Sequence, residues 1–120
     1  MLGLITLSIA EGATNSSRVV PATDVLAKIK AGQPAEFDNC TIVGDLNLST
    51  LKIDGPFHFN HTLFQNSVNF NLTIFNGTAY FGGSSFKGDA NFYGSSFNGT
   101  AYFRGSSFKG DWTAPLIVDS

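Results

Sequence analysis

The chain has 120 residues, of which 13% are charged, and its formal net charge is −2. This length predicts one small domain, and so weak a charge excludes the strongly basic surface that attracts nucleic acid. A single cysteine, Cys40, excludes an internal disulfide framework.

Residues 1–10 are apolar but too short to span a bilayer, so we expect no transmembrane segment. Two interpretations stay open. The segment is the remnant of a secretory signal, followed by the small residues Gly12 and Ala13, or it is an ordinary apolar N-terminus that lacks a basic region. Small polar residues come next, and we assign residues 1–19 to an apolar start and a linker.

Residues 21–32, PATDVLAKIKAG, predict a short amphipathic α-helix. Pro21 suits the first turn, Asp24 suits the positive end of the helix dipole, and Gly32 suits the C-terminal cap. The apolar face holds Val25, Leu26 and Ile29, with Ala22 beside them. Because an open solenoid end exposes its core and its backbone edge, we expect residues 20–34 to cap the repeats that follow.

The repeats are clearest in residues 79–111, which read AYFGGSSFKGD, ANFYGSSFNGT and AYFRGSSFKGD. Each copy holds two central Phe residues, and the spacing of these centres alternates between five and six residues back to Phe37. All fourteen centres are apolar and eleven are Phe: Phe37, Ile42, Leu48, Ile53, Phe59, Phe64, Phe70, Phe75, Phe81, Phe86, Phe92, Phe97, Phe103 and Phe108. Such a fixed period is typical of a solenoid.

The residues around each centre predict a short strand followed by a corner. Two residues before the centre stands a mostly small, uncharged residue, whereas the flanking residues are mostly polar. This alternation is typical of strands with one face inside. Two residues after most centres stands Gly, which adopts the unusual backbone angles of a sharp corner without strain.

The pattern over residues 35–111 resembles the pentapeptide-repeat family, in the variant that reads A-x-F-x-G-S/T-x-F-x-G. The resemblance implies an all-β solenoid: a right-handed, four-sided (quadrilateral) β-helix, here with a short N-terminal capping α-helix. Residues 19–49 also resemble the capping leader of such proteins in methanogenic archaea. Four sides give 22 residues per coil, and a flat two-sided coil of eleven residues stays open as the alternative.

The last segment, residues 112–120, departs from the pattern. Trp112 occupies a small-residue position, and Pro115 ends the repeat. We interpret this segment as a C-terminal lid or as the truncated continuation of the repeats.

The sequence offers little chemistry. His58 and His61 have no Cys, Asp or Glu neighbours at zinc-ligand spacing, and GSSFKGD lacks the residue order of a phosphate loop. Cys40 falls on the inward pattern, which predicts a buried structural thiol. We therefore expect no enzyme, no cofactor and no metal.

The outward positions provide the candidate sites. A 22-residue spacing stacks Tyr80 on Tyr102, and with Tyr93 these form a candidate binding face for a protein or a glycan. Seven of the ten Asn residues lie in N-x-S/T, the acceptor pattern for N-glycosylation. The candidate glycosylation sites are Asn47, Asn60, Asn71, Asn76 and Asn98. The competing interpretation is that these side chains only stabilise the coil.

Two functions follow from these expectations. The first is a non-enzymatic structural or interaction module, a rigid extracellular or cell-surface repeat domain. We expect such a module to form homo-oligomers by end-to-end association. The resemblance implies the second, an intracellular DNA-mimicking modulator of a topoisomerase-type partner. That role needs a long acidic rod, and Lys87, Arg104 and Lys109 interrupt any acidic face. We expect no nucleic-acid partner.

Overall fold

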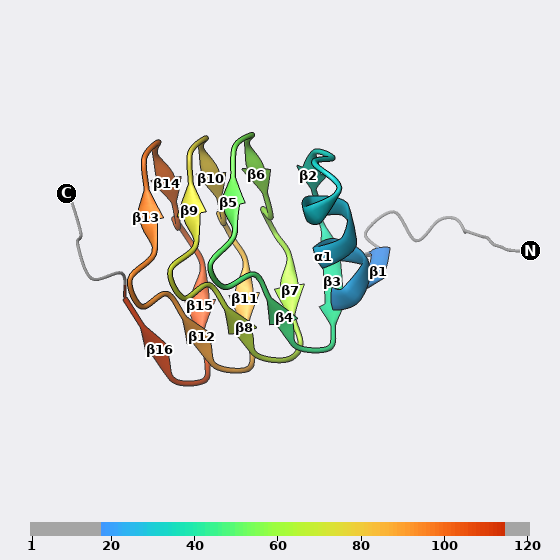
Figure 1. The fold of residues 1–120 in the computed structure, drawn as a ribbon. Helices are drawn as coiled ribbons and strands as arrows, with labels where there is room; N and C mark the ends of the chain where they lie inside the picture. Colours follow the sequence, from blue (N-terminus) through green and yellow to red (C-terminus); the bar gives the residue numbers. More distant parts are fainter. Residues whose placement is uncertain (1–17, 115–120) are drawn as a thin grey trace, which may run out of the picture.

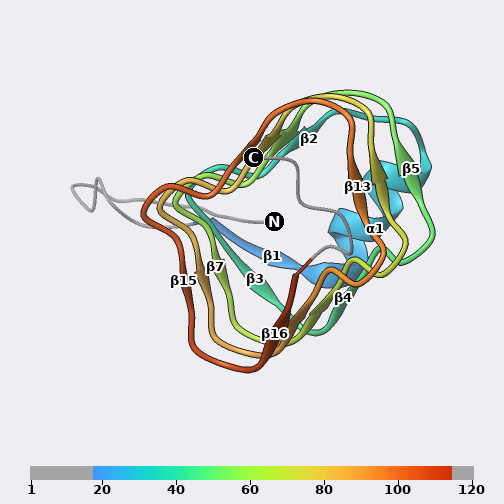
Figure 2. The same ribbon diagram turned by 90° about the vertical axis from the view of Figure 1, so that its left-hand side faces the viewer.

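The computed structural model describes residues 18–114, which form a coil of short parallel strands with one helix at its N-terminal end (Figure 1). The strands lie on four sides of the coil (Figure 2), which we call sides A to D. Side A holds β1 (Arg18–Pro21), β3 (Cys40–Val43), β7 (Leu63–Phe64), β11 (Ser85–Phe86) and β15 (Ser107–Phe108). Side B holds β2 (Ala35–Glu36), β6 (Phe57–His58), β10 (Ala79–Tyr80) and β14 (Ala101–Tyr102).

The other two sides are built in the same way. Side C holds β4 (Leu46–Asn47), β8 (Val68–Asn69), β12 (Ala90–Asn91) and β16 (Trp112–Thr113). Side D holds only three described strands, β5 (Lys52–Ile53), β9 (Ile74–Phe75) and β13 (Ser96–Phe97). Most strands are two residues long because the chain must turn a corner after every five or six residues.

The register confirms the four-sided coil. Every described strand pair is parallel and joins residues 22 apart, as in Ala79 with Ala101 and Phe86 with Phe108. The eleven-residue, two-sided alternative is therefore wrong. Seen from its C-terminal end, the chain passes from side B through A and C to D counter-clockwise while approaching the viewer, so the coil is right-handed (Figure 2).

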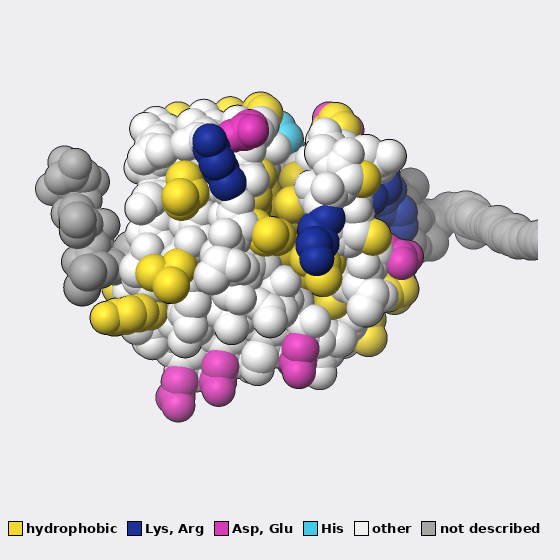
Figure 3. Space-filling model, viewed as in Figure 1, with side chains coloured by type: hydrophobic (Ala, Val, Ile, Leu, Met, Phe, Trp, Pro, Cys, Tyr) yellow, Lys and Arg dark blue, Asp and Glu magenta, His cyan; other side chains and the backbone are white. Residues whose placement is uncertain are grey.

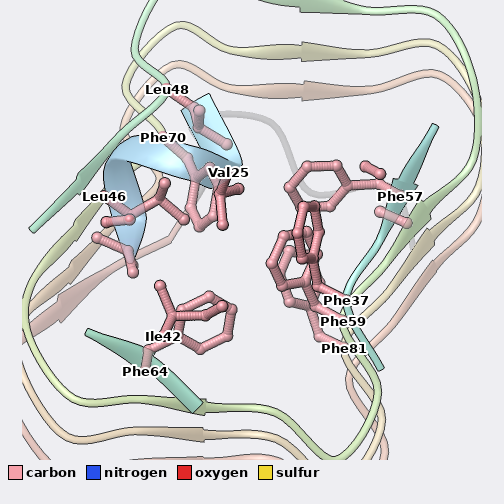
Figure 4. Packing of buried hydrophobic residues seen from close by; sticks show 14 of the residues in the cluster. Val25, Phe37, Ile42, Leu46, Leu48, Phe57, Phe59, Phe64, Phe70 and Phe81 are labelled. Atoms are coloured by element: carbon pink, nitrogen blue, oxygen red, sulfur yellow. The ribbon is translucent and has the colours of Figure 1, made fainter. Parts of the chain in front are cut away.

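The centres of the repeat fill the interior in columns. Phe37, Phe59 and Phe81 lie one above the other (Figure 4), with ring centroids 5.1 Å and 6.3 Å apart. Phe103 continues this column 4.9 Å from Phe81, with the two rings within 7° of parallel. The predicted stacking of Phe81 and Phe103 is confirmed. Such columns remove a large apolar surface from water at every coil.

The small inward residues do more than leave room for the rings. The hydroxyl groups of Thr62 and Thr73 donate to the backbone carbonyls of Phe37 (2.6 Å) and Leu48 (2.8 Å), which lie 25 residues earlier. Ser84 donates to the Phe59 carbonyl in the same way. Buried hydroxyl groups need such partners, and these bonds tie each coil to the one before it.

The corner glycines serve two purposes, of which the sequence indicated one. Gly83 has a φ of +67°, as predicted for a corner residue. Gly77 and Gly88 lie outside the left-handed region, and here the prediction of unusual angles is wrong. A Cβ atom would lie 2.8 Å from the Gly55 carbonyl carbon at Gly77 and 2.6 Å from the Asn66 carbonyl carbon at Gly88. These corners need glycine because successive coils approach each other closely.

The helix α1 (Ala22–Lys30) lies over the N-terminal end of the coil, as predicted (Figure 1). Val25 is fully buried and lies beside Leu46 and Leu48 (Figure 4), whereas Leu26 is half-buried. Gly32, with a φ of +77°, ends the helix in a Schellman arrangement in which its N–H and the next one bond carbonyls of the last turn.

Strand β1 was not predicted. It pairs in parallel with β3, places Val20 opposite Ile42 and buries the Val20 side chain. The expected boundary between residues 19 and 20 therefore runs through a strand. The helix interrupts the repeat between β1 and β2, so the pattern of centres could not be followed continuously to Val20.

At the C-terminal side, Trp112 pairs with Ala90 and is 55% exposed, with its ring 5.1 Å from that of Phe108. The predictions for residues 1–17 and 115–120, a signal remnant and a lid or continuation, lie outside the described residues. No helix within residues 18–114 has the length and apolarity to cross a membrane.

Candidate functional site

An aromatic ladder runs along the outer surface of side B. His58, Tyr80 and Tyr102 are on successive strands of this side, each 22 residues from the next. The His58 and Tyr80 rings are 4.6 Å apart and within 9° of parallel, and the Tyr80 and Tyr102 rings are 5.4 Å apart and within 11°. The predicted stacking of Tyr80 on Tyr102 is confirmed, and the same spacing could have placed His58 in the ladder.

Stacking determines which parts of these rings reach a ligand. Tyr80 is half-buried because His58 covers one face of its ring and Tyr102 covers the other. Tyr102 is 47% exposed and has only one neighbour in the described ladder. Ring edges and hydroxyl groups therefore face outward, which suits hydrogen bonding to a protein surface more than stacking of a sugar along the ladder.

Tyr93 does not join this ladder, so the predicted three-tyrosine face is divided. Tyr93 follows side C and is 53% exposed, and its carbonyl accepts a hydrogen bond from the Leu72 N–H (2.9 Å). Leu72 and Ile74 are also exposed. Hydrophobic side chains lie in small separate patches over sides C and D (Figure 3), which is ordinary for a soluble surface.

A shallow depression of about 490 Å³ adjoins the N-terminal end of the ladder. Its lining is polar and consists of Arg18, Glu36, Asp38, Asn39 and His58. The Arg18 guanidinium donates to the Glu36 carbonyl (3.3 Å), which holds β1 against side B. The depression brings together the positive charge of Arg18 and the negative charges of Glu36 and Asp38. Within residues 18–114, no three His, Cys, Asp or Glu side chains lie close enough together to hold a metal ion.

Cys40 lies beneath this depression and is only 1% exposed. Its Sγ accepts a hydrogen bond from Arg18 (3.3 Å) and donates one to the Asp38 carbonyl (3.4 Å). The prediction of a buried structural thiol agrees with this position. Arg18 and Cys40 thus donate hydrogen bonds to the Glu36 and Asp38 carbonyls at the N-terminal edge of side B. These are the bonds that a further strand would otherwise supply there.

The candidate glycosylation sites differ in how far their amide groups are already engaged. Asn98 donates to Asn76 (2.6 Å), and Asn76 donates to Asp54 (2.8 Å), so these two Nδ2 atoms belong to a ladder. The exposed Asn47 instead uses its Oδ1 atom to accept from the Ser49 N–H (3.0 Å), and no hydrogen bond within residues 18–114 engages its Nδ2.

The remaining two candidate sites are half-buried. The Asn60 Oδ1 accepts from the Gly82 N–H (2.9 Å) of the next coil. The Asn71 Oδ1 is buried and has no hydrogen-bond partner among the described residues, although the Asn71 backbone N–H donates to the Asn69 Oδ1 (2.9 Å). Of the five candidates, Asn47 is therefore the one whose Nδ2 a glycan reaches with the least disturbance of the coil.

Comparison with known proteins identifies the repeat. Residues 59–107 match the family model described as pentapeptide repeats (9 copies). The matched segment consists of the coils whose centres are all Phe and leaves out the first coil, with its Ile and Leu centres. No curated protein and no solved structure matches the chain.

Proposed function

We propose that this chain, which belongs to the pentapeptide-repeat family through residues 59–107, is a non-enzymatic module. It presents its outer surface to a partner at the cell surface or outside the cell. The β-solenoid supplies a stiff support, since each coil is bonded to its neighbours along four sides. The outward side chains supply the contacts.

The observation that carries this proposal is the strict separation of inward and outward positions. From Phe57 to Phe92 every Phe is buried to 2% exposure or less, whereas the six sequon Asn residues within residues 18–114 lie on outward or corner positions. Outward side chains can therefore vary, bind or be modified without disturbing the core. The excess of sequons and the apolar residues 1–10 support a location outside the cell.

The aromatic ladder favours a protein over a glycan as the partner. Its ring faces are covered by stacking, and the Tyr80 and Tyr102 hydroxyl groups are carried on neighbouring coils of one side. Tyrosine is enriched at protein interfaces because it combines an apolar ring with a hydrogen-bonding end. Tyr102, at the more exposed end, offers the largest uncovered ring surface.

The alternative role, a DNA-mimicking modulator of a topoisomerase-type partner, has less support. A DNA mimic needs a continuous acidic face, but exposed Lys52, Lys87, Arg104 and Lys109 are spread over the described coils. The net charge of −2 is also too small to reproduce the charge of a duplex.

Binding of the purified chain to intact source cells and to their wall fractions tests the proposal. We expect saturable binding that Tyr102→Ala reduces about tenfold, the effect of removing one interface hot spot. Tyr93→Ala is the matched control, because Tyr93 is about as exposed as Tyr102 but lies outside the ladder. An absence of binding to every surface fraction, or equal losses in the two variants, would contradict the proposed binding surface.

A further inference from the structure

The N-terminal end of the coil is finished on three sides and open on the fourth. Side A is extended by β1, and side B has its edge carbonyls bonded by Arg18 and Cys40. Side C begins at β4, which is packed under α1. Side D begins at β5, and no described strand pairs with the N-terminal edge of β5.

The backbone of β5 shows what this edge offers. The N–H groups of Ile74 and Asn76 donate to the carbonyls of Leu51 (2.9 Å) and Ile53 (2.8 Å), so these carbonyls face the next coil. Because strand groups alternate in direction, the N–H and C=O of Lys52 point the other way, toward the open edge. No hydrogen bond within residues 18–114 reaches either group.

The surroundings of the edge combine apolar and basic side chains with two exposed carboxylates, those of Asp54 just after β5 and of Asp24 in the first turn of α1. Leu51, just before β5, and Leu26 and Ile29 of α1 are each half-buried against the core. Lys28 and Lys30 of α1 and Lys52 of β5 are exposed or nearly so. Figure 3 shows a hollow between the N-terminal cap and the body of the coil, with hydrophobic side chains in it and a basic side chain at its rim.

We propose that the free edge of β5 binds an extended acidic segment of a partner protein, which adds to side D as a further strand. Exposed strand edges are bound in this way, with backbone hydrogen bonds giving affinity and side chains giving specificity. Apolar residues at alternate positions of the segment cover Leu26 and Leu51, and its carboxylates meet Lys52 and the basic last turn of α1. This edge is separate from the aromatic ladder, so the two sites are tested independently.

The first experiment measures binding of a fluorescent peptide of about eight residues, within the usual length of a strand, in which Glu and Val alternate. The control peptide replaces every Glu with Lys. We expect the full chain to bind the acidic peptide at least about tenfold more tightly. Equal affinity for the two peptides, or no binding of either, overturns the proposal.

A pair of charge variants locates the bound peptide. Lys28→Glu with Lys30→Glu reverses both basic charges in the last turn of α1 and weakens binding about tenfold. Lys87→Glu with Lys109→Glu is the matched control, because these two exposed lysines lie on later coils, away from β5. Equal losses in the two double variants would show a nonspecific charge effect and overturn the assigned location.

Amide hydrogen exchange of the folded chain tests the edge itself. The Lys52 amide should exchange rapidly in the free chain and become protected when the acidic peptide binds. The Ile74 amide, which is bonded to Leu51, is the internal control and should be protected in both states. Protection of Lys52 in the free monomer shows an edge that is already covered, and protection that depends on chain concentration shows a second copy there. Either result overturns the proposal.

Discussion

The first coil, residues 35–56, and the third coil, residues 79–100, have the same backbone but reach it with different residues. At equivalent corners the first coil has Thr50 with a φ of +65°, and the third has Gly94 with a φ of +68°. Thr is β-branched and disfavours this region, whereas Gly does not. The corner angle is therefore imposed by the stacking of coils, and the third coil adopts it without the local strain of the first.

The two coils also differ in what covers them. In the first coil the centres Ile42, Leu48 and Ile53 are all buried, although they are smaller than Phe. In the third coil Phe97 remains half-buried despite its parallel stack on Phe75, at 4.7 Å and 2°. Burial thus depends on the coil or cap on either side. The centres of the first coil are buried by the helical cap, whereas the burial of those in the third coil comes from stacking on the Phe rings of neighbouring coils.

The largest expected effect tests the columns of rings. Phe86 is 1% exposed and lies between Phe64 (4.6 Å) and Phe108 (4.7 Å). Phe86→Ala should lower the free energy of unfolding by about 3–5 kcal/mol, the range for a large core truncation. The exposed neighbour provides the control, since Lys87→Ala should change it by less than about 0.5 kcal/mol. Similar denaturant midpoints for the two variants would mean that inward and outward are wrongly assigned.

An intermediate effect on stability should distinguish Gly77 from Gly55, which lies at the equivalent corner one coil earlier. Gly77→Ala places a Cβ atom 2.8 Å from the Gly55 backbone and should cost about 1–3 kcal/mol, as overpacking does. At Gly55 a Cβ atom meets no atom of residues 18–114 within 4 Å, so Gly55→Ala should be nearly neutral. Thermal unfolding of both variants checks this difference. If both variants were equally destabilised, close approach of the coils could not be the reason for glycine at this corner.

The smallest effect concerns corner strain in the first coil. Thr50→Gly replaces a β-branched residue at a positive φ with one that adopts this angle without strain. The free energy of unfolding should rise by up to about 1 kcal/mol, once the entropic cost of ordering the new glycine is subtracted. At the equivalent corner of the third coil, Gly94→Ala should destabilise the chain, because it places a side chain at a φ of +68° and its Cβ atom would lie 2.6 Å from the Leu72 side chain. A loss of stability in Thr50→Gly would show that Thr50 contributes more than strain.

The coil itself could be predicted because its two signals are local and repeated. The apolar centres, such as Phe81 and Phe103, define which side chains point inward. Their alternating five- and six-residue spacing fits a two-sided coil as well as a four-sided one, and only the resemblance to the pentapeptide-repeat family favoured four sides. Strand β1 lacks such a signal: Val20 lies 22 residues before Ile42, but α1 interrupts the pattern between them. A single residue at the right distance is too weak to predict a strand.

The surface was harder to predict than the core. The 22-residue spacing predicted the pair Tyr80 and Tyr102, but not the separation of Tyr93, which depends on where each corner turns. The Asn side chains also differ in whether they bond to the next coil along the axis. Asn76 and Asn98 do so, whereas Asn47 bonds the backbone two residues later. Short polar side chains choose between these partners by local geometry, which a repeat pattern does not contain.

Mass spectrometry of the native protein, combined with cell fractionation, tests the proposed surface location most directly. We expect the protein outside the membrane, with a glycan on Asn47 of the first coil at higher occupancy than on Asn98 of the third, whose Nδ2 is bonded to Asn76. The comparison of the two coils thus predicts the order in which these Asn residues are modified. Recovery of wholly unmodified protein from the cytosol would contradict the proposed function.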